Sequence, residues 1–463
     1  MRIIHSARSV YEALPEVARM PIGAVSRLLP VPMRLGSAFV EARREAQRAS
    51  ALDSEELYFQ TTSKLRSFLS EVSGAAYCRE TLMGAGLEAN RMTLEGLATL
   101  PTCSKEDVRE HLADFAAPMP HSGRKWVMTG GTTGEPFGFW LERDASARDW
   151  AYTVNAWART GFELDDRRVV LRGVRLGARG SRRLFAYEPI RRELYVSVFD
   201  LSDEHLPAIR ARIAAFNPRF IHGYPSALES LGASYVSSGE EPPRLDALLL
   251  VSENLYPGQR ERLESYFRTR TFSFYGMSEK VVFAAECECS HELHVEPLYG
   301  IVELLDESGR TITEPGVVGE IVATGMMNRA LALIRYRTGD YAAWAAGACS
   351  CGRHLPRLDS VHGHRMQEYL LGATGVRITM TALTPHMAVA DDVKRFQLIQ
   401  NVPGRVRLLI EKAPGTGSEV PKGFVEALEA KLAGQVTVLP EVVREIPPTE
   451  RGKHRCIVQE IEE

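Results

Sequence analysis

The stretch from Arg219 to Gly276, RFIHGYPSALESLGASYVSSGEEPPRLDALLLVSENLYPGQRERLESYFRTRTFSFYG, alternates short apolar runs with helical patterns. RFIHGYP, LDALLLV and TFSFYG are typical of strands, and residues 226–238 and 259–267 between them predict helices. Strands that alternate with helices in this way pair in parallel, and ligands bind at the carboxyl ends of such strands. The stretch therefore predicts an α/β fold with layered sheets.

The helical pattern extends toward the N-terminus. Trp150 and Trp157 fall on one face of a helix that Gly161 can end. Residues 54–87 also have a helical pattern, and Ser104 in LPTCSKEDVREHLADF is a typical helix cap, with acidic residues in the turn that follows. These signals predict a helix-rich N-terminal part.

A different pattern begins at Val295. Segments such as YGIVELLDESGR and GEIVATGM are short strands with tight turns, which favours antiparallel sheet. Beyond VHGHRMQEYLL the chain mixes strands with one helix, at residues 423–432. We therefore expect a large N-terminal domain at residues 1–362, with a helical arm over about the first 100 residues, and a small mobile α+β domain at residues 363–463.

Composition narrows the class of protein. The chain has 463 residues, 44% apolar and 25% charged, and a formal net charge of −3. This charge gives no electrostatic case for nucleic acid as a partner, and no apolar run is long enough to predict a membrane span. The first fifty residues are basic and weakly amphipathic, so a peripheral membrane contact there is the alternative to a purely cytoplasmic protein. The oligomeric state is left open.

The seven cysteines are unevenly placed. Cys287 and Cys289 form one pair, and Cys349 and Cys351 form another. In a chain with no recognisable secretion signal, this pairing favours a metal site over disulfides. Buried reduced cysteines without a metal are the alternative.

The segment MTGGTTGEPFGFW, from Met128 to Trp140, is rich in glycine and threonine. Glycine lets the backbone approach a ligand closely, and N–H groups with hydroxyls are neutral donors to phosphate oxygens. The segment is not the common nucleotide loop, because Gly134 is followed by Glu135 rather than lysine. We interpret it as an anion-binding loop, with a glycine-rich turn between strands as the alternative.

Four further stretches follow this loop in a characteristic order: VSENLYPGQ, FYGMSE, RYRTGD and ERGKHR. Together with SKEDVREH, HGYPSALESL and CSCGRHLPRL, they resemble the adenylate-forming superfamily, which includes acyl-CoA synthetases and peptide-synthetase adenylation domains. Within it, the chain is similar to the phenylacetate-CoA ligase-like family and to its CapK-type branch of capsular polysaccharide biosynthesis. The resemblance extends from about Leu57 to Gln459.

The resemblance implies ATP-dependent activation of a carboxylic acid. The acid would form an acyl-AMP with release of pyrophosphate, and the acyl group would pass to an amine, a hydroxyl or a carrier thiol. A coenzyme A thioester is the closest alternative, and a non-catalytic binding protein is a more distant one. The identities of the acid and of the acceptor stay open at this point.

The resemblance also implies roles for individual residues. Tyr275 would stack on adenine, Asp340 would bind the ribose hydroxyls, and Glu279 would bind magnesium, a hard cation that prefers oxygen ligands. Thr132, Glu279, Arg365 and Lys453 would be the catalytic residues, with Lys453 stabilising charge during adenylation. The full nucleotide-binding set would be Thr129, Gly130, Gly131, Thr132, Thr133, Gly134, Ser252, Glu253, Tyr275, Gly276, Met277, Ser278, Asp340, Arg365 and Lys453.

The domain hinge is not assigned to one residue. Many superfamily members have Gly-Arg followed by an acidic hinge residue. In GHRMQEYL, His364 stands between Gly363 and Arg365, and Gln367 with Glu368 occupies the place of the acid.

The family resemblance places a structural zinc on the paired cysteines. The ligands it implies are Cys287, His294, Cys349 and Cys351. Thiolates with an imidazole are the donors that a closed zinc site prefers. Cys289 and His291 are the competing ligands.

Aromatic residues around the predicted strands are candidates for the acid-binding pocket. Their character mildly favours an aryl or otherwise planar acid, and core packing is the alternative explanation. The candidates are Trp150, Tyr152, His222, Tyr224, Phe274 and Met277.

Overall fold

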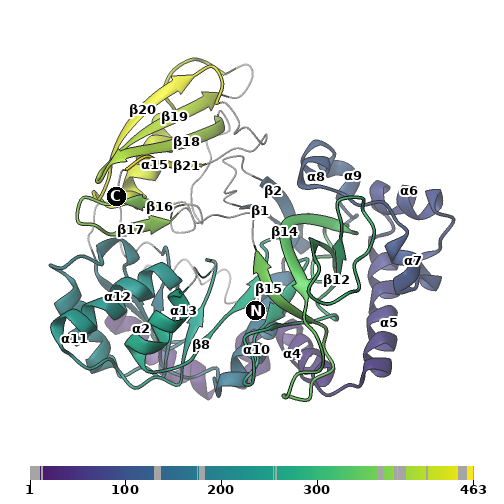
Figure 1. Ribbon diagram of the computed structural model, residues 1–463, viewed down its shortest axis with the longest axis horizontal. Helices are drawn as coiled ribbons and strands as arrows, with labels where there is room; N and C mark the ends of the chain where they lie inside the picture. The colour runs from purple at the N-terminus through teal and green to yellow at the C-terminus, as the bar shows by residue number, and fades with distance from the viewer. Residues whose placement is uncertain are drawn as a thin grey trace.

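The computed structural model describes most of the chain, and Figure 1 shows its course. The described residues are 11, 14–129, 137–174, 176, 183–253, 255, 258–362, 369–379, 383, 393–412, 416–446 and 456–461. Helices and sheets alternate in the large N-terminal part, and a separate sheet with one helix lies at the C-terminal end. The predicted α/β class is confirmed.

The alternating stretch forms a six-stranded, mainly parallel sheet with the order β4-β5-β3-β6-β7-β8. Only β4 runs antiparallel to its neighbour. The strands are β3 (Arg168–Leu171), β4 (Phe185–Glu188), β5 (Glu193–Val196), β6 (Phe220–Gly223), β7 (Ala247–Leu250) and β8 (Thr271–Phe272). The helices of this region are α10 (Ala145–Trp157), α11 (Leu206–Phe216), α12 (Pro225–Ser238) and α13 (Gln259–Phe267).

A seven-stranded antiparallel sheet follows, with the order β12-β13-β14-β15-β11-β10-β9. It begins earlier than the predicted Val295, because TFSFYG is divided between two sheets: β8 completes the parallel sheet and the next strand starts the antiparallel one. The strands are β9 (Phe274–Gly276), β10 (Phe283–Ala285), β11 (Leu293–Val295), β12 (Gly300–Leu305), β13 (Val318–Gly325), β14 (Tyr336–Trp344) and β15 (Arg357–His362).

The N-terminal part is helical, as predicted. Ser104 caps α8 through a capping box, since its side chain accepts from Asp107 N–H and the Asp107 carboxylate accepts from Ser104 N–H. The helices are α2 (Glu16–Leu28), α3 (Val31–Leu35), α4 (Ser37–Ala49), α5 (Ser54–Val72), α6 (Ala76–Gly84), α7 (Leu94–Ala98), α8 (Lys105–Glu110) and α9 (Leu112–Phe115). Helix α4 packs along α10, which ties the N-terminal part to the body.

The glycine-rich segment is flanked by a two-stranded hairpin, β1 (Arg124–Thr129) and β2 (Phe137–Glu142). At the C-terminal end, β20-β19-β18-β21 form a four-stranded sheet with one helix, and β16-β17 form a small hairpin. These elements are β16 (Tyr369–Leu371), β17 (Arg377–Thr379), β18 (Val393–Val402), β19 (Arg405–Lys412), α15 (Lys422–Leu432), β20 (Thr437–Val443) and β21 (Ile457–Gln459). The predicted α+β character of this part is confirmed.

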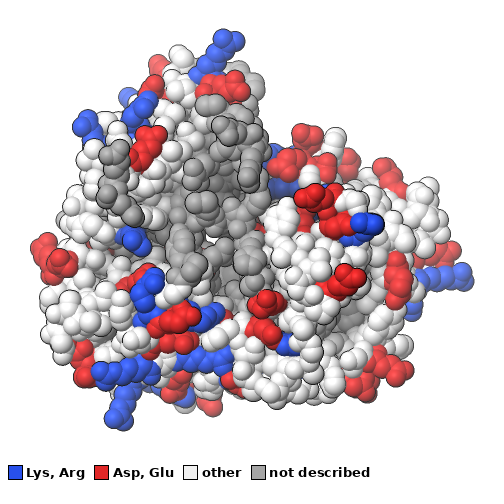
Figure 2. Space-filling view, in the orientation of Figure 1, with Lys and Arg blue, Asp and Glu red and all other residues white. Residues whose placement is uncertain are grey.

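Four short 3-10 helices complete the described elements. They are η1 (Ala89–Arg91), η2 (His121–Gly123), η3 (Ala158–Thr160) and η4 (Val198–Asp200). Gly161 ends η3 in the left-handed conformation, with φ of 78°, which glycine adopts without strain. On the face drawn in Figure 2, acidic and basic side chains are interspersed over the described surface.

Candidate active site and metal centre

Two of the predicted nucleotide motifs meet directly. Tyr275 lies on β9 and Asp340 on β14, and the Tyr275 hydroxyl donates a 2.8 Å hydrogen bond to Asp340 Oδ2. Asp340 follows Gly339, which takes a φ of 74°, and the Thr338 hydroxyl accepts from Asp340 N–H. The turn therefore holds the carboxylate against the tyrosine. Sixty-five positions separate the two residues in sequence.

Glu279 lies in the loop after β9 and is buried. Within the described part of the chain, no hydrogen bond or ion pair engages its carboxylate. Burial and the nearby Glu279 charge raise the pKa of Tyr336 above its ordinary value. A buried carboxylate without a cationic partner costs free energy, so this group is suited to receive a cation.

The segment after Glu279 is held from two sides. Lys280 has a φ of 62°, and its ammonium lies 2.7 Å from Asp149 on α10. A Cβ on Gly300 would clash with the carbonyl oxygen of Val281, and one on Gly325 would lie 2.6 Å from the Val281 Cα atom. Both glycines are thus required by close packing, and they leave the loop little freedom to shift.

Asp149 was missed in the sequence analysis. Its second oxygen accepts a 2.8 Å hydrogen bond from the Tyr299 hydroxyl, and Tyr299 is fully buried. A lone aspartate in a helix carries no motif, and only the approach of α10 to the loop reveals its contact with Lys280. We regard Asp149 and Lys280 as positioning residues for Glu279.

Ser252 and Glu253 lie beyond the carboxyl end of β7, where ligands of parallel sheets bind. Ser252 takes a φ of 65°, an uncommon conformation for serine. The Glu253 carboxylate accepts hydrogen bonds from the Ser226 N–H, at 3.0 Å, and from the Ser226 hydroxyl, at 3.1 Å. Glu253 therefore fixes its loop to the N-terminus of α12.

Gly276, Met277 and Ser278 connect β9 to Glu279. Gly276 and Ser278 are exposed, and Met277 is half-buried. A Cβ on Gly276 would come no closer than 3.6 Å to other protein atoms. Packing against the described residues therefore does not require a glycine there.

Several predicted residues lie outside the described part of the chain. They are Gly130, Gly131, Thr132, Thr133, Gly134, Arg365 and Lys453. Thr129 ends β1, where it pairs with Phe137. The glycine-rich segment thus follows the end of a strand, and its residues 130–136 lie outside the described part of the chain.

Two of the pocket candidates belong to one aromatic cluster. Trp157 makes edge contacts with Trp150, at a ring distance of 5.3 Å, and with His222, at 4.8 Å. His222 also bonds through Nδ1 to the Leu249 carbonyl, at 3.0 Å. Burial and two nearby arginine guanidiniums hold the pKa of His222 well below its usual range. His222 is therefore a neutral core residue.

Two of the other candidates, Tyr152 and Phe274, both contact the Phe283 ring. Tyr224 is buried at the start of α12, and Phe274 is half-buried and stacks on Phe283 at 5.1 Å. Tyr152 is buried and donates to Glu45 of α4 at 2.7 Å, so its hydroxyl points toward the N-terminal arm. Trp150, Tyr152 and Phe274 thus belong to one apolar cluster around α10, which fits the core-packing alternative for them.

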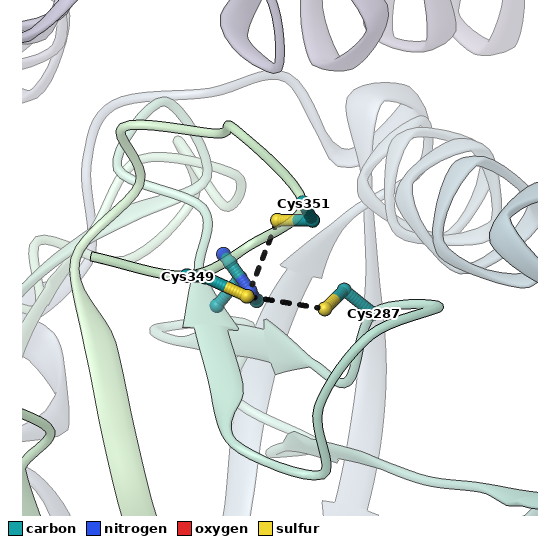
Figure 3. A group of neighbouring side chains, drawn as sticks. Cys287, Cys349 and Cys351 are labelled. Carbon is teal, nitrogen blue, oxygen red and sulfur yellow. Dashed lines mark hydrogen bonds between the residues drawn. The ribbon is translucent and has the colours of Figure 1, made fainter.

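Figure 3 shows the cysteine cluster. The ligand atoms of Cys287, His294, Cys349 and Cys351 all lie within 4.8 Å of one another. Cys287 Sγ is 3.6 Å from Cys349 Sγ, and Cys351 Sγ is 3.7 Å from His294 Nε2. A tetrahedral zinc with bonds of about 2.3 Å to sulfur and about 2.0 Å to nitrogen gives edges close to these lengths. The four donors fit a structural zinc.

The competing ligands point elsewhere. His291 Nδ1 lies 2.9 Å from Glu286 Oε2, and Cys289 is exposed. The Cys289 N–H donates to Cys287 Sγ at 3.3 Å, so the contact of Cys289 with the cluster is made by its backbone. Burial lowers the pKa of His294 to about 4, which keeps its imidazole neutral, as a metal ligand must be.

These features coincide with a family match. A sequence profile described as AMP-binding enzyme matches residues 95–329, just over half of the chain. The chain belongs to the AMP-binding enzyme family. A second profile, the CapK C-terminal domain, matches residues 370–460. The recognition of the adenylate-forming superfamily and its CapK-type branch is thereby confirmed, and so is the assignment as an adenylate-forming ligase.

Curated relatives agree with this family. The chain is 27% identical to phenylacetate-coenzyme A ligase of Thermus thermophilus over 194 residues, which cover 40% of this chain and 43% of the relative. It is 20% identical to protein CapK of Staphylococcus aureus over 394 residues, which cover 82% of this chain and 84% of the relative. The match to the Thermus enzyme thus spans less than half of that protein.

Solved structures share the fold. A crystal structure of 2-hydroxyisobutyryl-CoA ligase in complex with 2-HIB-AMP and CoA, in the thioesterification state, gives a TM-score of 0.57 at 18% identity. The superposition covers 90% of this chain and 92% of the 2-hydroxyisobutyryl-CoA ligase chain. The same enzyme in a postadenylation state gives a TM-score of 0.55 at 17% identity, covering 89% and 91%. Among the described helices of this chain, none has the length and apolarity needed to cross a bilayer.

Proposed function

We propose that this enzyme activates a carboxylic acid with ATP and transfers the acyl group to an amine, a hydroxyl or a carrier thiol. In the first step a carboxylate oxygen attacks the α-phosphorus, the bond to the bridging oxygen breaks, and pyrophosphate leaves. In the second step the acceptor attacks the acyl carbon, loses its proton, and AMP leaves with the electron pair of the broken C–O bond.

The meeting of Tyr275 and Asp340 carries the proposal. Their 2.8 Å hydrogen bond puts an aromatic ring for adenine beside a carboxylate for the ribose hydroxyls. Glu279 follows Tyr275 by four residues, in the loop after β9. Three groups suited to three parts of one nucleotide therefore occupy neighbouring positions. Ser252 and Glu253, at the end of β7, complete the proposed adenine side.

Magnesium suits the Glu279 position. Its buried carboxylate is a hard oxygen donor, and magnesium in such sites takes one or two carboxylates and keeps phosphate and water oxygens as its other ligands. When bound, the ion would neutralise phosphate charge. The residues of this chain would hold and orient ATP: Thr129 through Gly134 at the β- and γ-phosphates, Arg365 at the nucleotide, and Lys453 at the α-phosphate and the acid.

Coenzyme A is the second candidate acceptor. The names of two relatives favour it, since one is a phenylacetate-coenzyme A ligase and the other is a 2-hydroxyisobutyryl-CoA ligase. Similarity to CapK and to its C-terminal domain over the acceptor-side part of the chain favours the biosynthetic transfer instead.

We further propose a structural zinc at Cys287, His294, Cys349 and Cys351. It would link the loop before β11 to the loop before β15, two neighbouring strands of the antiparallel sheet. We also propose the domain division at residues 362 and 363, just after β15, and a cytoplasmic enzyme.

A panel of acids tests the proposal. Exchange of labelled pyrophosphate into ATP that requires a particular acid would support acyl-AMP formation, since only reversal of the first step regenerates labelled ATP. The best acid is then supplied with amines, alcohols, carrier protein and coenzyme A in turn. If no acid supports exchange above the rate of a Glu279→Gln control, the proposed activity is wrong.

A further inference from the structure

The solvent-facing side of α2 is wholly apolar. Val17 and Leu28 are 83% and 85% exposed, and Leu29 and Met33, which follow the helix, are also exposed. A surface helix of a globular protein turns its apolar side to the core, so the orientation of α2 is reversed. The exposed residues of α2 are Val17, Ala18, Met20, Pro21, Ile22, Ala24, Val25 and Leu28.

The inward side of α2 is polar, and specific contacts hold it in place. A Cβ on Gly23 would lie 2.5 Å from Pro189 Cβ, so the helix backbone sits directly on the turn after β4. Arg27 Nη1 donates to the Pro189 carbonyl at 2.8 Å, and Arg19 lies 3.6 Å from Glu188. The residues of α2 that face inward are Glu16, Arg19, Gly23, Ser26 and Arg27. These contacts keep the apolar side turned to solvent.

Helix α3 is anchored in the same way. Arg34 donates two hydrogen bonds to the Asp165 carboxylate, at 2.7 and 3.2 Å. Such a bidentate pair fixes the orientation of the guanidinium. Met33, on the same short helix, remains exposed. The apolar surface therefore continues from α2 onto α3.

The surroundings of α2 are basic. Residues 14–35 carry three arginines and one glutamate, a formal charge of +2. Residues 183–193, which include β4 and the turn beneath α2, carry three arginines and two glutamates, a formal charge of +1. Arg183 and Arg191 of this segment are exposed. In a chain with a net charge of −3, positive charge is thus concentrated around the apolar side of the arm.

We propose that α2 and α3 bind the surface of an anionic lipid bilayer, with the apolar side of α2 in the boundary between headgroups and acyl chains. A helix that separates apolar and polar sides, with arginines nearby, is the type that lies in this interface. A protein partner of ordinary size would form about ten hydrogen bonds. The outward side chains of α2 offer neither donors nor acceptors, which favours lipid as the occupant.

Vesicle sedimentation with the full-length enzyme tests this proposal. The enzyme should bind vesicles of equal parts phosphatidylglycerol and phosphatidylcholine, and bind pure phosphatidylcholine much more weakly. Raised salt should weaken the first interaction, because it screens the arginines. A Val17→Glu/Leu28→Glu variant should lose at least about tenfold in partitioning, since two apolar anchors become charged.

Matched controls separate this effect from general surface hydrophobicity. A Phe59→Glu/Met83→Glu variant alters two similarly exposed side chains, on α5 and α6, and should bind vesicles like the parent. Both variants should keep the parental melting temperature, since the four side chains are exposed. Equal vesicle binding by parent and Val17→Glu/Leu28→Glu, or no binding by the parent, overturns the proposal. If the parent is a dimer that does not bind vesicles, and the Val17→Glu/Leu28→Glu variant is a monomer, the surface binds a second copy of the chain instead.

Discussion

Tyr275 on β9 donates a 2.8 Å hydrogen bond to Asp340 on β14 of the same antiparallel sheet, although three strands separate β9 from β14 in the strand order. This contact predicts that the two residues act together on ATP. Tyr275→Phe keeps the ring but removes this hydrogen bond to Asp340, so it should raise the KM for ATP while kcat stays nearly unchanged. The loss of free energy of ATP binding should be about 1.5–3 kcal/mol, the range for a hydrogen bond to a charged group. Tyr275→Ala should raise the KM for ATP further, because the aromatic surface proposed to stack on adenine is also removed. Equal effects of the two variants in exchange kinetics would contradict this division of roles.

Glu279→Gln is expected to leave the fold intact and to remove most acid-dependent exchange. The amide has nearly the same shape, but it lacks the charge that a magnesium ligand needs. The decisive measurement is the dependence of the exchange rate on magnesium concentration, which should shift to higher values in the variant. A parental magnesium dependence would remove Glu279 from the proposed site.

The ion pair between Lys280 and Asp149 should matter to catalysis without either residue touching substrate. Asp149→Asn and Lys280→Met should each lower kcat, because the Glu279 loop loses its tie to α10. The double variant should lower kcat by little more than either single variant does, since each single substitution already removes the same ion pair. Fully additive losses would show that the two residues do not act through their contact.

Zinc analysis of the purified enzyme should find about one ion per chain, as a closed four-ligand site requires. Cys349→Ser should lower both the zinc content and the melting temperature. Cys289→Ser is the matched control, because Cys289 is exposed and outside the cluster, and it should change neither. Unchanged stability and metal content in Cys349→Ser would exclude the site.

Lys453 tests whether the two chemical steps use different residues. Lys453→Ala should cut acyl-AMP formation by roughly 10²–10³, the effect of removing one charge-stabilising donor. Transfer from chemically supplied acyl-AMP should continue, because the charge that Lys453 would stabilise develops in the first step. Equal damage to both steps would indicate a shared substrate contact or a folding defect.

The α/β class follows from local patterns. The runs that became β6, β7 and β8 are short and apolar and are separated by helical segments, so periodicity was enough to predict parallel pairing. The border of the second sheet was predicted wrongly, at Val295 instead of Phe274. A short buried strand has the same pattern in either sheet, because periodicity reports burial and not the identity of the neighbouring strand.

Residue chemistry was also accessible from sequence. Tyr275, Glu279 and Asp340 came from the family resemblance as candidates for adenine, magnesium and ribose, and these roles stay predictions. The contribution of Asp149 was not accessible, because it depends on where α10 approaches the loop. The sequence left Cys287 and His294 open against Cys289 and His291 as candidate zinc ligands, and the course of the loop groups Cys287 and His294 with Cys349 and Cys351.

By itself, the sequence determined which chemical groups this protein has and the order in which they follow along the chain. Tertiary structure decided which of them share one place and which side of an element faces the core. For α2, an amphipathic pattern alone favours burial of the apolar side. The structure instead exposes the apolar side of α2. The close packing of Gly23 on Pro189 and the hydrogen bond from Arg27 to the Pro189 carbonyl fix this orientation, because contacts between distant segments outweigh a local pattern.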